Sequence, residues 1–150
     1  MKERWHIDER LLVLQDIENE TAKITCRKPV PMRSKDFKDK TIGSFSRIEN
    51  ITYISIKYLS SNKRQDHLDV IDTIVHECRH AYQWSNITDK RIELNDNNEI
   101  DNDLIDDWRE NFKNYLDKET YGDDVYRNQP VEYDSFAFSR DVMTFVSLKE

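Results

Sequence analysis

The stretch Asp69–Trp84 constrains the fold of this chain more than any other, because it carries two helical patterns at once. His76 and His80, four residues apart, lie on one helical face. The spacing predicts a helix over about Gln65–Trp84, preceded by capping residues within Ser60–Asn62, with the histidine face toward a cleft and an apolar stripe on a sheet. The apolar stripe consists of Ile71, Ile74, Val75, Cys78 and Tyr82.

The centre of this stretch, His76-Glu77-Cys78-Arg79-His80, is an H-E-x-x-H pattern. On a helix the two imidazoles can bind one metal ion, and the carboxylate beside the first can take a proton from a water held there. In a chain with four histidines the pattern arises by chance in roughly one case in a hundred. We therefore expect His76 and His80 to bind Zn²⁺ and Glu77 to act as a general base.

A catalytic zinc site needs three protein ligands, so the two histidines leave one ligand to be found. His67 is about 13.5 Å from His76 along the predicted helix, too far to share the ion, and His6 belongs to the N-terminal segment. A carboxylate is the remaining choice. Glu132 is preferred because apolar residues flank it on the predicted last helix, where a buried charge requires a partner. Asp134 stays open as the alternative ligand, and stabilisation of the helix dipole as the alternative role of Glu132.

The length of 150 residues predicts a single domain over residues 1–150. The net charge of -7 lacks the basic excess of a general nucleic-acid binder, and the basic stretch Arg27–Lys40 is expected to be a solvated loop. Cys26 and Cys78 are expected to be free thiols, because they form no disulfide framework. Neither an apolar signal-peptide core nor a run of about 18 apolar residues occurs, so we expect a cytoplasmic protein without a membrane partner.

β-Branched and aromatic residues concentrate in Ile42–Tyr58, which predicts a hairpin with its turn at Glu49–Asn50. The second strand, Ile51–Tyr58, has one polar face and is expected at one side of the sheet, where an extended peptide could pair with it. Lys23–Cys26 is predicted as a further short strand, ended by the prolines that follow it.

Apolar residues at helical spacing predict three more helices. The polar segment Ser85–Asp103 is expected to be a loop, and it lacks the glycine and glutamate positions of a calcium loop, so no specific calcium site is expected. The predicted helices are Asp8–Glu20, Leu104–Leu116 and a last helix that begins near Gln129-Pro130.

The H-E-x-x-H segment, followed on another helix by Glu132-x-x-Ser135, resembles the gluzincin branch of the zincin metallopeptidases. The chain is also similar to short bacterial and phage zincin-like domains, which carry H-E-x-x-H-A-x-Q followed by a P-x-E-x-x-A/S helix. The resemblance covers about Gly43–Ser139. It implies an α+β, zincin-like fold: a small, mostly antiparallel sheet, a long active-site helix and C-terminal helices. The family often has an aspartate four residues after the glutamate, and here that position is Phe136.

The resemblance implies zinc-dependent hydrolysis of peptide bonds in a protein or peptide substrate, with Glu77 as general base. Tyr126 or Arg127, just before the last helix, are candidates for stabilising the oxyanion. Two other functions remain open: a non-catalytic zinc domain with a regulatory or interaction role, and a metal-free helical adaptor whose acidic segment Glu93–Glu110 binds a basic partner. The cleavage sequence and the oligomeric state do not follow from these residues.

Overall fold

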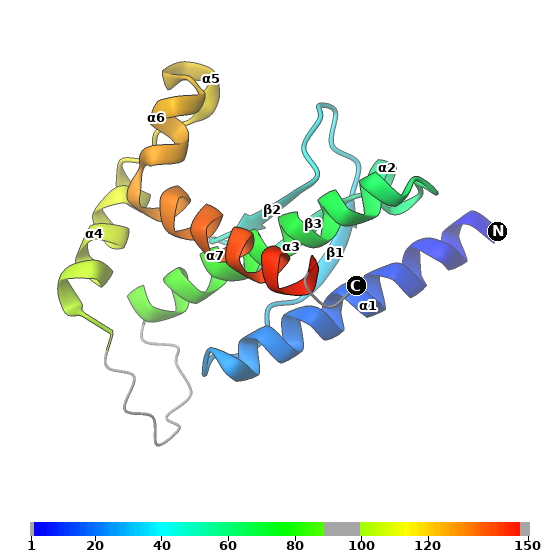
Figure 1. Ribbon diagram of the computed structural model, residues 1–150, viewed down its shortest axis with the longest axis horizontal. Coiled ribbons are helices and arrows are strands. Elements are labelled where there is room, and N and C mark those ends of the chain that lie inside the picture. The colour runs from blue at the N-terminus through cyan, green and yellow to red at the C-terminus, as the bar shows by residue number, and fades with distance from the viewer. Residues whose placement is uncertain (1, 89–99, 148–150) are drawn as a thin grey trace.

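The computed structural model describes residues 2–88 and 100–147, in which seven helices and three strands form an α+β structure, as predicted (Figure 1). Among the described residues, every helix is too short or too polar to span a lipid bilayer. The helices are α1 (Lys2–Ile24), α2 (Ile56–Leu59), α3 (Arg64–Ile87), α4 (Asn102–Lys113), α5 (Lys118–Tyr121), α6 (Asp123–Asn128) and α7 (Pro130–Ser147). The strands are β1 (Met32–Lys35), β2 (Gly43–Ser46) and β3 (Ile51–Ser55).

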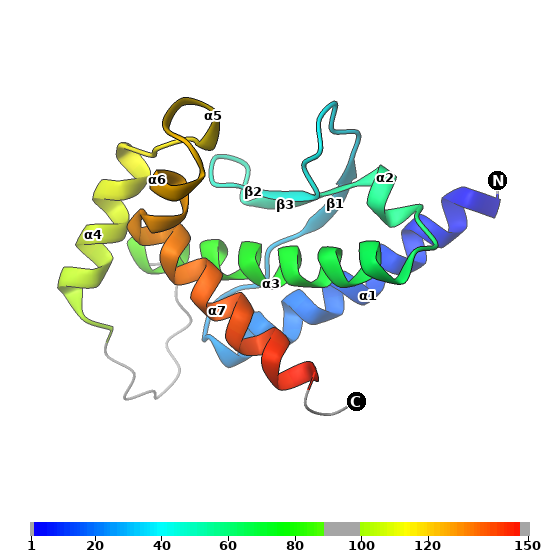
Figure 2. The same ribbon diagram turned by 45° about the horizontal axis from the view of Figure 1, so that its top comes forward.

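The long helix α3 runs through the middle of the molecule, with the strands along one side, α1 along another and α7 crossing it (Figure 2). Of its predicted apolar stripe, Ile74, Val75 and Cys78 are buried and the other two residues are half-buried, and the stripe contacts two separate clusters. Ile74 and Cys78 pack with α1, β3 and α2, whereas Tyr82 packs against Trp108 of α4. Complete burial of a side chain such as Ile74 contributes about 1.5–3 kcal/mol. The first cluster consists of Leu14, Ile54, Leu59, Val70, Ile74 and Cys78.

The start of α3 differs from the predicted cap. Lys63 is the N-cap residue, and its side chain forms no capping hydrogen bond. Within the predicted segment Ser60–Asn62, the Ser61 hydroxyl accepts the Lys63 N–H at 3.1 Å and donates to Asp66 in the first turn. The serine therefore organises the helix start through a side chain of that turn rather than by capping a backbone N–H of the helix.

The sheet is mixed rather than mostly antiparallel as predicted, with the strand order β1-β3-β2. The strand predicted over Ile51–Tyr58 ends at Ser55, continues as helix α2, and lies in the centre of the sheet rather than at its side. β3 pairs in parallel with β1 and antiparallel with β2. β2 therefore forms the free edge nearest α3. The predicted turn at Glu49–Asn50 is confirmed, with Asn50 at a φ of 54°.

The strand predicted at Lys23–Cys26 is wrong, because α1 continues to Ile24 and Cys26 has a φ of 54°, outside the extended region. The parallel strand forms instead at Met32–Lys35, within the stretch predicted as a solvated loop. The position of β1 depends on long-range contacts, which local strand propensity does not predict. The Met32 N–H donates to the Gln15 side chain on α1 at 2.8 Å, and the Thr52 N–H of β3 donates to the Pro31 carbonyl.

β2 lies close against α3 at Gly43. A Cβ atom at this position would lie 2.9 Å from Cγ2 of Thr73 on α3 and 3.1 Å from Cδ1 of Ile54 on β3. Glycine therefore allows the edge strand to approach the histidine-bearing helix closely.

The C-terminal half follows the predicted order of helices. α4 begins at Asn102, where the Asp101 side chain accepts the Asp103 N–H, and α7 begins at Pro130, a residue suited to a first helical position. The predicted loop Ser85–Asp103 is shorter at its start, because α3 continues to Ile87, and residues 89–99 lie outside the described residues. Most of the segment considered for calcium lies there, as do residues 93–99 of the acidic segment Glu93–Glu110, whose remainder is described and belongs mainly to α4.

Candidate metal centre

Two helices bring together His76, His80 and Glu132. The histidines are one turn apart on α3, and the glutamate lies in the first turn of α7. His76 Nε2 is 3.0 Å from one Glu132 oxygen, His80 Nε2 is 3.2 Å from the other, and the two nitrogens are 3.0 Å apart. All three side chains are buried, with Glu132 only 1% exposed. Three potential ligand atoms therefore converge on one point.

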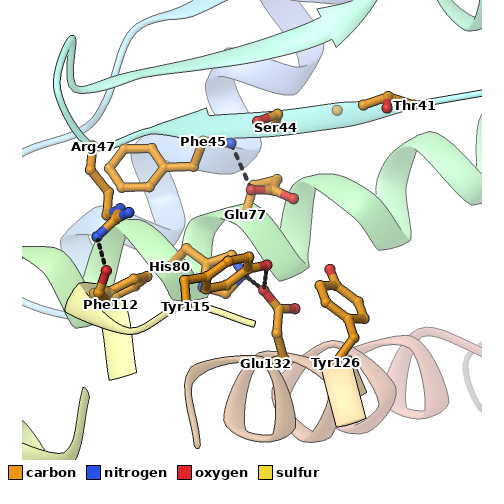
Figure 3. Close-up of a pocket in the computed structure, with 11 residues that line it drawn as sticks. Thr41, Ser44, Phe45, Arg47, Glu77, His80, Phe112, Tyr115, Tyr126 and Glu132 are labelled. Atoms are coloured by element: carbon orange, nitrogen blue, oxygen red, sulfur yellow. Dashed lines mark hydrogen bonds and ion pairs between the residues drawn. The ribbon is translucent and has the colours of Figure 1, made fainter. Parts of the chain in front are cut away.

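The donor set fits a bound metal ion. Two imidazoles and one carboxylate form a set that catalytic zinc sites use, and a carboxylate this deeply buried requires a cation or a hydrogen bond to offset its desolvation. Glu77, His80 and Glu132 also line a cavity of about 300 Å³ (Figure 3), and His76 lines a wider cavity that shares Glu77 with it. The residues present could thus hold a metal with one side open.

The alternative ligand, Asp134, lies outside this group. Its two oxygens accept hydrogen bonds from Arg79 Nε at 2.7 Å and Nη2 at 2.9 Å. His67 is also separate, because its Nε2 is 2.7 Å from the carbonyl of Ser61 near the start of α3. Of the carboxylate candidates, Glu132 is the one that the fold brings to the histidines.

The three side chains form a strongly coupled charge cluster. Burial would lower the pKa of His80, but its hydrogen bond to Glu132 and the negative charges of Glu77 and Glu132 outweigh burial and raise the pKa to about 9. Burial would raise the pKa of Glu132, yet the hydrogen bonds from His76 and His80 outweigh it and hold the pKa well below its usual range. The cluster thus favours positive charge at the point where a metal cation would displace a proton.

Gln83, which the sequence analysis did not select as a site residue, fixes the orientation of His80. The amide oxygen of this fully buried residue lies 2.9 Å from His80 Nδ1. Its amide nitrogen faces acceptors on α7, the Val131 carbonyl at 3.0 Å and the Asp134 carboxylate at 2.7 Å. Because the amide cannot turn around without losing these bonds, His80 Nδ1 must carry a proton. His80 Nε2 is then the atom available to a metal.

His76 lacks the equivalent support. Its Nδ1 is buried without a hydrogen-bond partner among the described residues, and the Phe136 ring packs on the imidazole with the centroids 4.5 Å apart. Phe136 occupies the position where the gluzincin pattern often has an aspartate. The two histidines therefore differ at Nδ1, which is held by a hydrogen bond in His80 and surrounded only by packing in His76.

Gln83→Ala should weaken metal affinity by about ten- to a hundredfold, because loss of the amide frees the His80 ring and removes the acceptor that fixes its protonation. Competition with a chromophoric zinc chelator measures the affinity. Gln65→Ala, at an exposed glutamine in the first turn of the same helix, is the matched control and should leave affinity unchanged. Wild-type affinity in the Gln83 variant would contradict this positioning role.

Glu77 lies between the edge strand and the triad. The backbone N–H of Phe45 on β2 donates to one Glu77 oxygen at 2.7 Å, which leaves the other oxygen for the cavity that Glu77 lines (Figure 3). The residue as a whole is 9% exposed. The strand thus holds Glu77 in place beside the triad without removing its capacity to accept a proton.

Two tyrosines close the cavity on the side of α7. The Tyr115 hydroxyl donates to Glu132 at 2.6 Å, and the Tyr126 ring lies next to it with the centroids 6.3 Å apart. Burial and the charge of Glu132 raise the pKa of both phenols, so both stay protonated and can donate hydrogen bonds. Tyr126 was predicted near the site; Tyr115 was missed, because its place in the apolar stripe of the predicted helix hid its polar role.

Arg127, the alternative to Tyr126, points away from the triad. Its guanidinium lies over the Phe136 ring, 4.4 Å from the ring centroid, and its Nε donates to Asp123 at 2.9 Å.

Comparisons of the chain with protein-family models, with curated proteins and with solved structures find no match. The function must therefore be inferred from the chemistry of the cavity and its residues.

Proposed function

We propose that the protein is a zinc-dependent peptidase with a zincin-like, gluzincin-type site, which hydrolyses peptide bonds in a protein or peptide substrate. The observation that carries this proposal is the convergence of His76, His80 and Glu132 next to Glu77 in an open cavity. A structural zinc site is normally closed by four protein ligands, whereas a catalytic one keeps a position for water or substrate. Three ligands beside a cavity support the catalytic class.

His76, His80 and Glu132 would hold the Zn²⁺ ion, which would supply a water molecule of lowered pKa and polarise a carbonyl group. Glu77 takes the proton as the water attacks the carbonyl and returns it to the leaving amine. Tyr126, a neutral phenol that lines the same cavity as Glu77, is the proposed hydrogen-bond donor to the oxyanion. Tyr115 positions Glu132 through its hydrogen bond to that carboxylate.

The edge strand β2 suits an extended peptide. Among the described residues β2 pairs on one side only, with β3, and its outer side faces the cavity. Phe45 donates its N–H outward to Glu77, and alternation along an antiparallel strand directs the backbone groups of Gly43 outward as well. A substrate could add itself to this edge by main-chain hydrogen bonds, which would hold its peptide bonds over the triad.

Protein purified without a histidine tag should contain zinc, cleave unfolded protein or peptide libraries, lose cleavage on chelation and regain it with zinc. His76→Ala and Glu132→Ala should lose both metal and cleavage, whereas Asp141→Ala, at an exposed carboxylate of α7, should retain both. Elemental analysis and a fluorescent cleavage assay measure these outcomes.

The alternatives give different results in the same experiment. Zinc that depends on the triad, without cleavage of any library, would favour a non-catalytic zinc domain. Protein free of metal, with variants that behave like the wild type, would overturn the proposal and leave the helical adaptor.

A further inference from the structure

We propose that Arg47 selects the substrate by binding a carboxylate, so that the cleaved peptides carry an acidic side chain on the N-terminal side of the scissile bond. This inference rests on the proposed function and names the substrate class of the same cavity. Arg47 directly follows β2 and lines the cavity of about 300 Å³ together with Glu77, His80 and Glu132. Substrate lying over the triad therefore passes this guanidinium.

The guanidinium of Arg47 is held firmly. Its Nη1 donates to the carbonyl of Phe112, at the end of α4, at 3.0 Å, and its Cζ lies 4.5 Å from the centroid of the Phe112 ring (Figure 3). The guanidinium also lies over the Trp84 ring on α3, with Cζ 5.7 Å from the ring centroid. These contacts join β2, α3 and α4 around one partly buried side chain. A guanidinium fixed in this way binds a planar anion with little loss of side-chain entropy.

The charge of Arg47 has no carboxylate partner in the part of the chain that the structure describes. Within residues 2–88 and 100–147 it forms no ion pair, whereas the buried Arg27 pairs with Glu18 and the partly buried Arg79 pairs with both oxygens of Asp134. Aromatic faces and one carbonyl stabilise a cation without matching its charge. Arg10, also partly buried, has no ion pair either, but three oxygen acceptors surround its guanidinium, whereas Arg47 has one and faces the cavity. This contrast points to a carboxylate that arrives with the substrate.

The end of the cleft away from Arg47 is lined by an excess of negative charge. A wider cavity of about 1030 Å³ continues past His76 and Glu77, and more carboxylates than lysines line it. An acidic substrate group is therefore repelled at that end and attracted at Arg47. The charged residues of the wider cavity, apart from Glu77, are Asp39, Asp72, Asp117, Glu119, Lys40 and Lys118.

Strand direction decides which side of the substrate meets Arg47. β2 runs from Gly43 to Ser46, and Arg47 stands just beyond its C-terminal end. A peptide that adds antiparallel to this strand runs the opposite way, so its N-terminal part passes Arg47. The acidic residue consequently lies before the scissile bond, and the C-terminal part of the peptide enters the acidic cavity.

The test uses the zinc-loaded protein and peptide pairs that differ only by glutamate or glutamine before the scissile bond. The glutamate peptides should have a kcat/KM about ten- to a hundredfold higher, mainly through KM, because a hydrogen-bonded ion pair is lost in the glutamine peptides. Arg47→Gln should abolish the preference and Arg47→Glu should reverse it toward lysine peptides. Arg33→Gln, at an exposed arginine of β1, is the control and should keep it.

Reversal by Arg47→Glu cannot result from lost packing alone, so it separates recognition from structural damage. An unchanged glutamate preference in Arg47→Gln would overturn the inference. A second pair of peptides, with a free or an amidated C-terminus, distinguishes the source of the carboxylate. A preference for the free C-terminus that disappears in Arg47→Gln would overturn the assignment to an acidic side chain.

A measurement of peptide binding tests the role of Arg47 independently of the proposed peptidase activity. Fluorescence anisotropy with zinc-loaded Glu77→Gln, which should bind without cleaving, measures the affinity for the same glutamate and glutamine peptides. Binding that depends on Arg47 and favours glutamate, without cleavage by the wild type, would preserve the recognition and reject the peptidase. Cleavage at equal rates of both peptides would preserve the peptidase and reject the recognition, and no binding of either peptide would also reject it.

Discussion

Glu77→Gln should retain zinc but reduce kcat/KM for peptide cleavage by at least about 10²–10⁴-fold, the usual contribution of a general base. The carboxylate is not part of the candidate triad of His76, His80 and Glu132, so its replacement leaves those side chains in place. A glutamine has nearly the same shape, and its amide oxygen can still accept the Phe45 N–H that now bonds to Glu77. What it cannot do is take a proton from a water molecule.

Elemental analysis, thermal unfolding and a cleavage assay on the same preparation test this result. Glu110→Gln, at an exposed glutamate of α4, provides the matched control and should keep full activity. Cleavage at the wild-type rate by zinc-loaded Glu77→Gln would show that Glu77 is not the general base and would remove the main support for a zincin-type mechanism.

The second large effect concerns stability. Glu18→Ala should lower the free energy of unfolding by about 3–5 kcal/mol, because it leaves Arg27 as a buried charge without its partner. Both side chains are 1% exposed, and the Glu18 carboxylate also accepts the Val30 N–H at 2.7 Å and the Cys78 thiol at 2.9 Å. Arg27 in turn donates to the Cys78 carbonyl at 3.3 Å. The pair therefore joins α1 to the back of the helical turn that carries the two histidines.

Urea unfolding followed by circular dichroism measures the change. Glu20→Ala is the control, because Glu20 forms an exposed pair with Lys23 at 3.9 Å, and it should leave stability nearly unchanged. The double variant Glu18→Met, Arg27→Met should recover part of the loss, since apolar residues can replace a complete buried ion pair but cannot accept the Val30 N–H. Equal stabilities of Glu18→Ala and Glu20→Ala would contradict the role assigned to the pair.

Buried polar groups of this kind cannot be recognised from the sequence, and one of them explains a wrong prediction. Cys78 has its predicted place in the apolar core, yet its thiol donates to Glu18. The prolines and basic residues after Cys26 predict a solvated loop, but Arg27 is buried and the chain continues into β1. Charged residues are usually exposed, and a single sequence gives no sign that a partner 9 residues away will bury one.

Which strand forms the sheet edge next to α3 could not be assigned from the sequence either. Alternation and β-propensity locate the strands around Phe45 and Ile54, but the position of a strand within the sheet depends on what pairs with it. β1 takes the other side of β3 and leaves β2 at the edge. Gly43 then allows that edge to approach α3, so the backbone of β2, rather than that of β3, meets Glu77.

The sequence by itself determined the central helix, the shared face of His76 and His80, and the start of the last helix at Pro130. Those features follow from spacing within a few residues, which helical geometry converts directly into position. Only the tertiary structure decided between Glu132 and Asp134. Both residues lie near the start of α7, and the choice depends on how α7 crosses α3, which brings Glu132 to the histidines while Arg79 binds Asp134. Local periodicity carries no information about that crossing, because side chains more than 50 residues apart pack to form it.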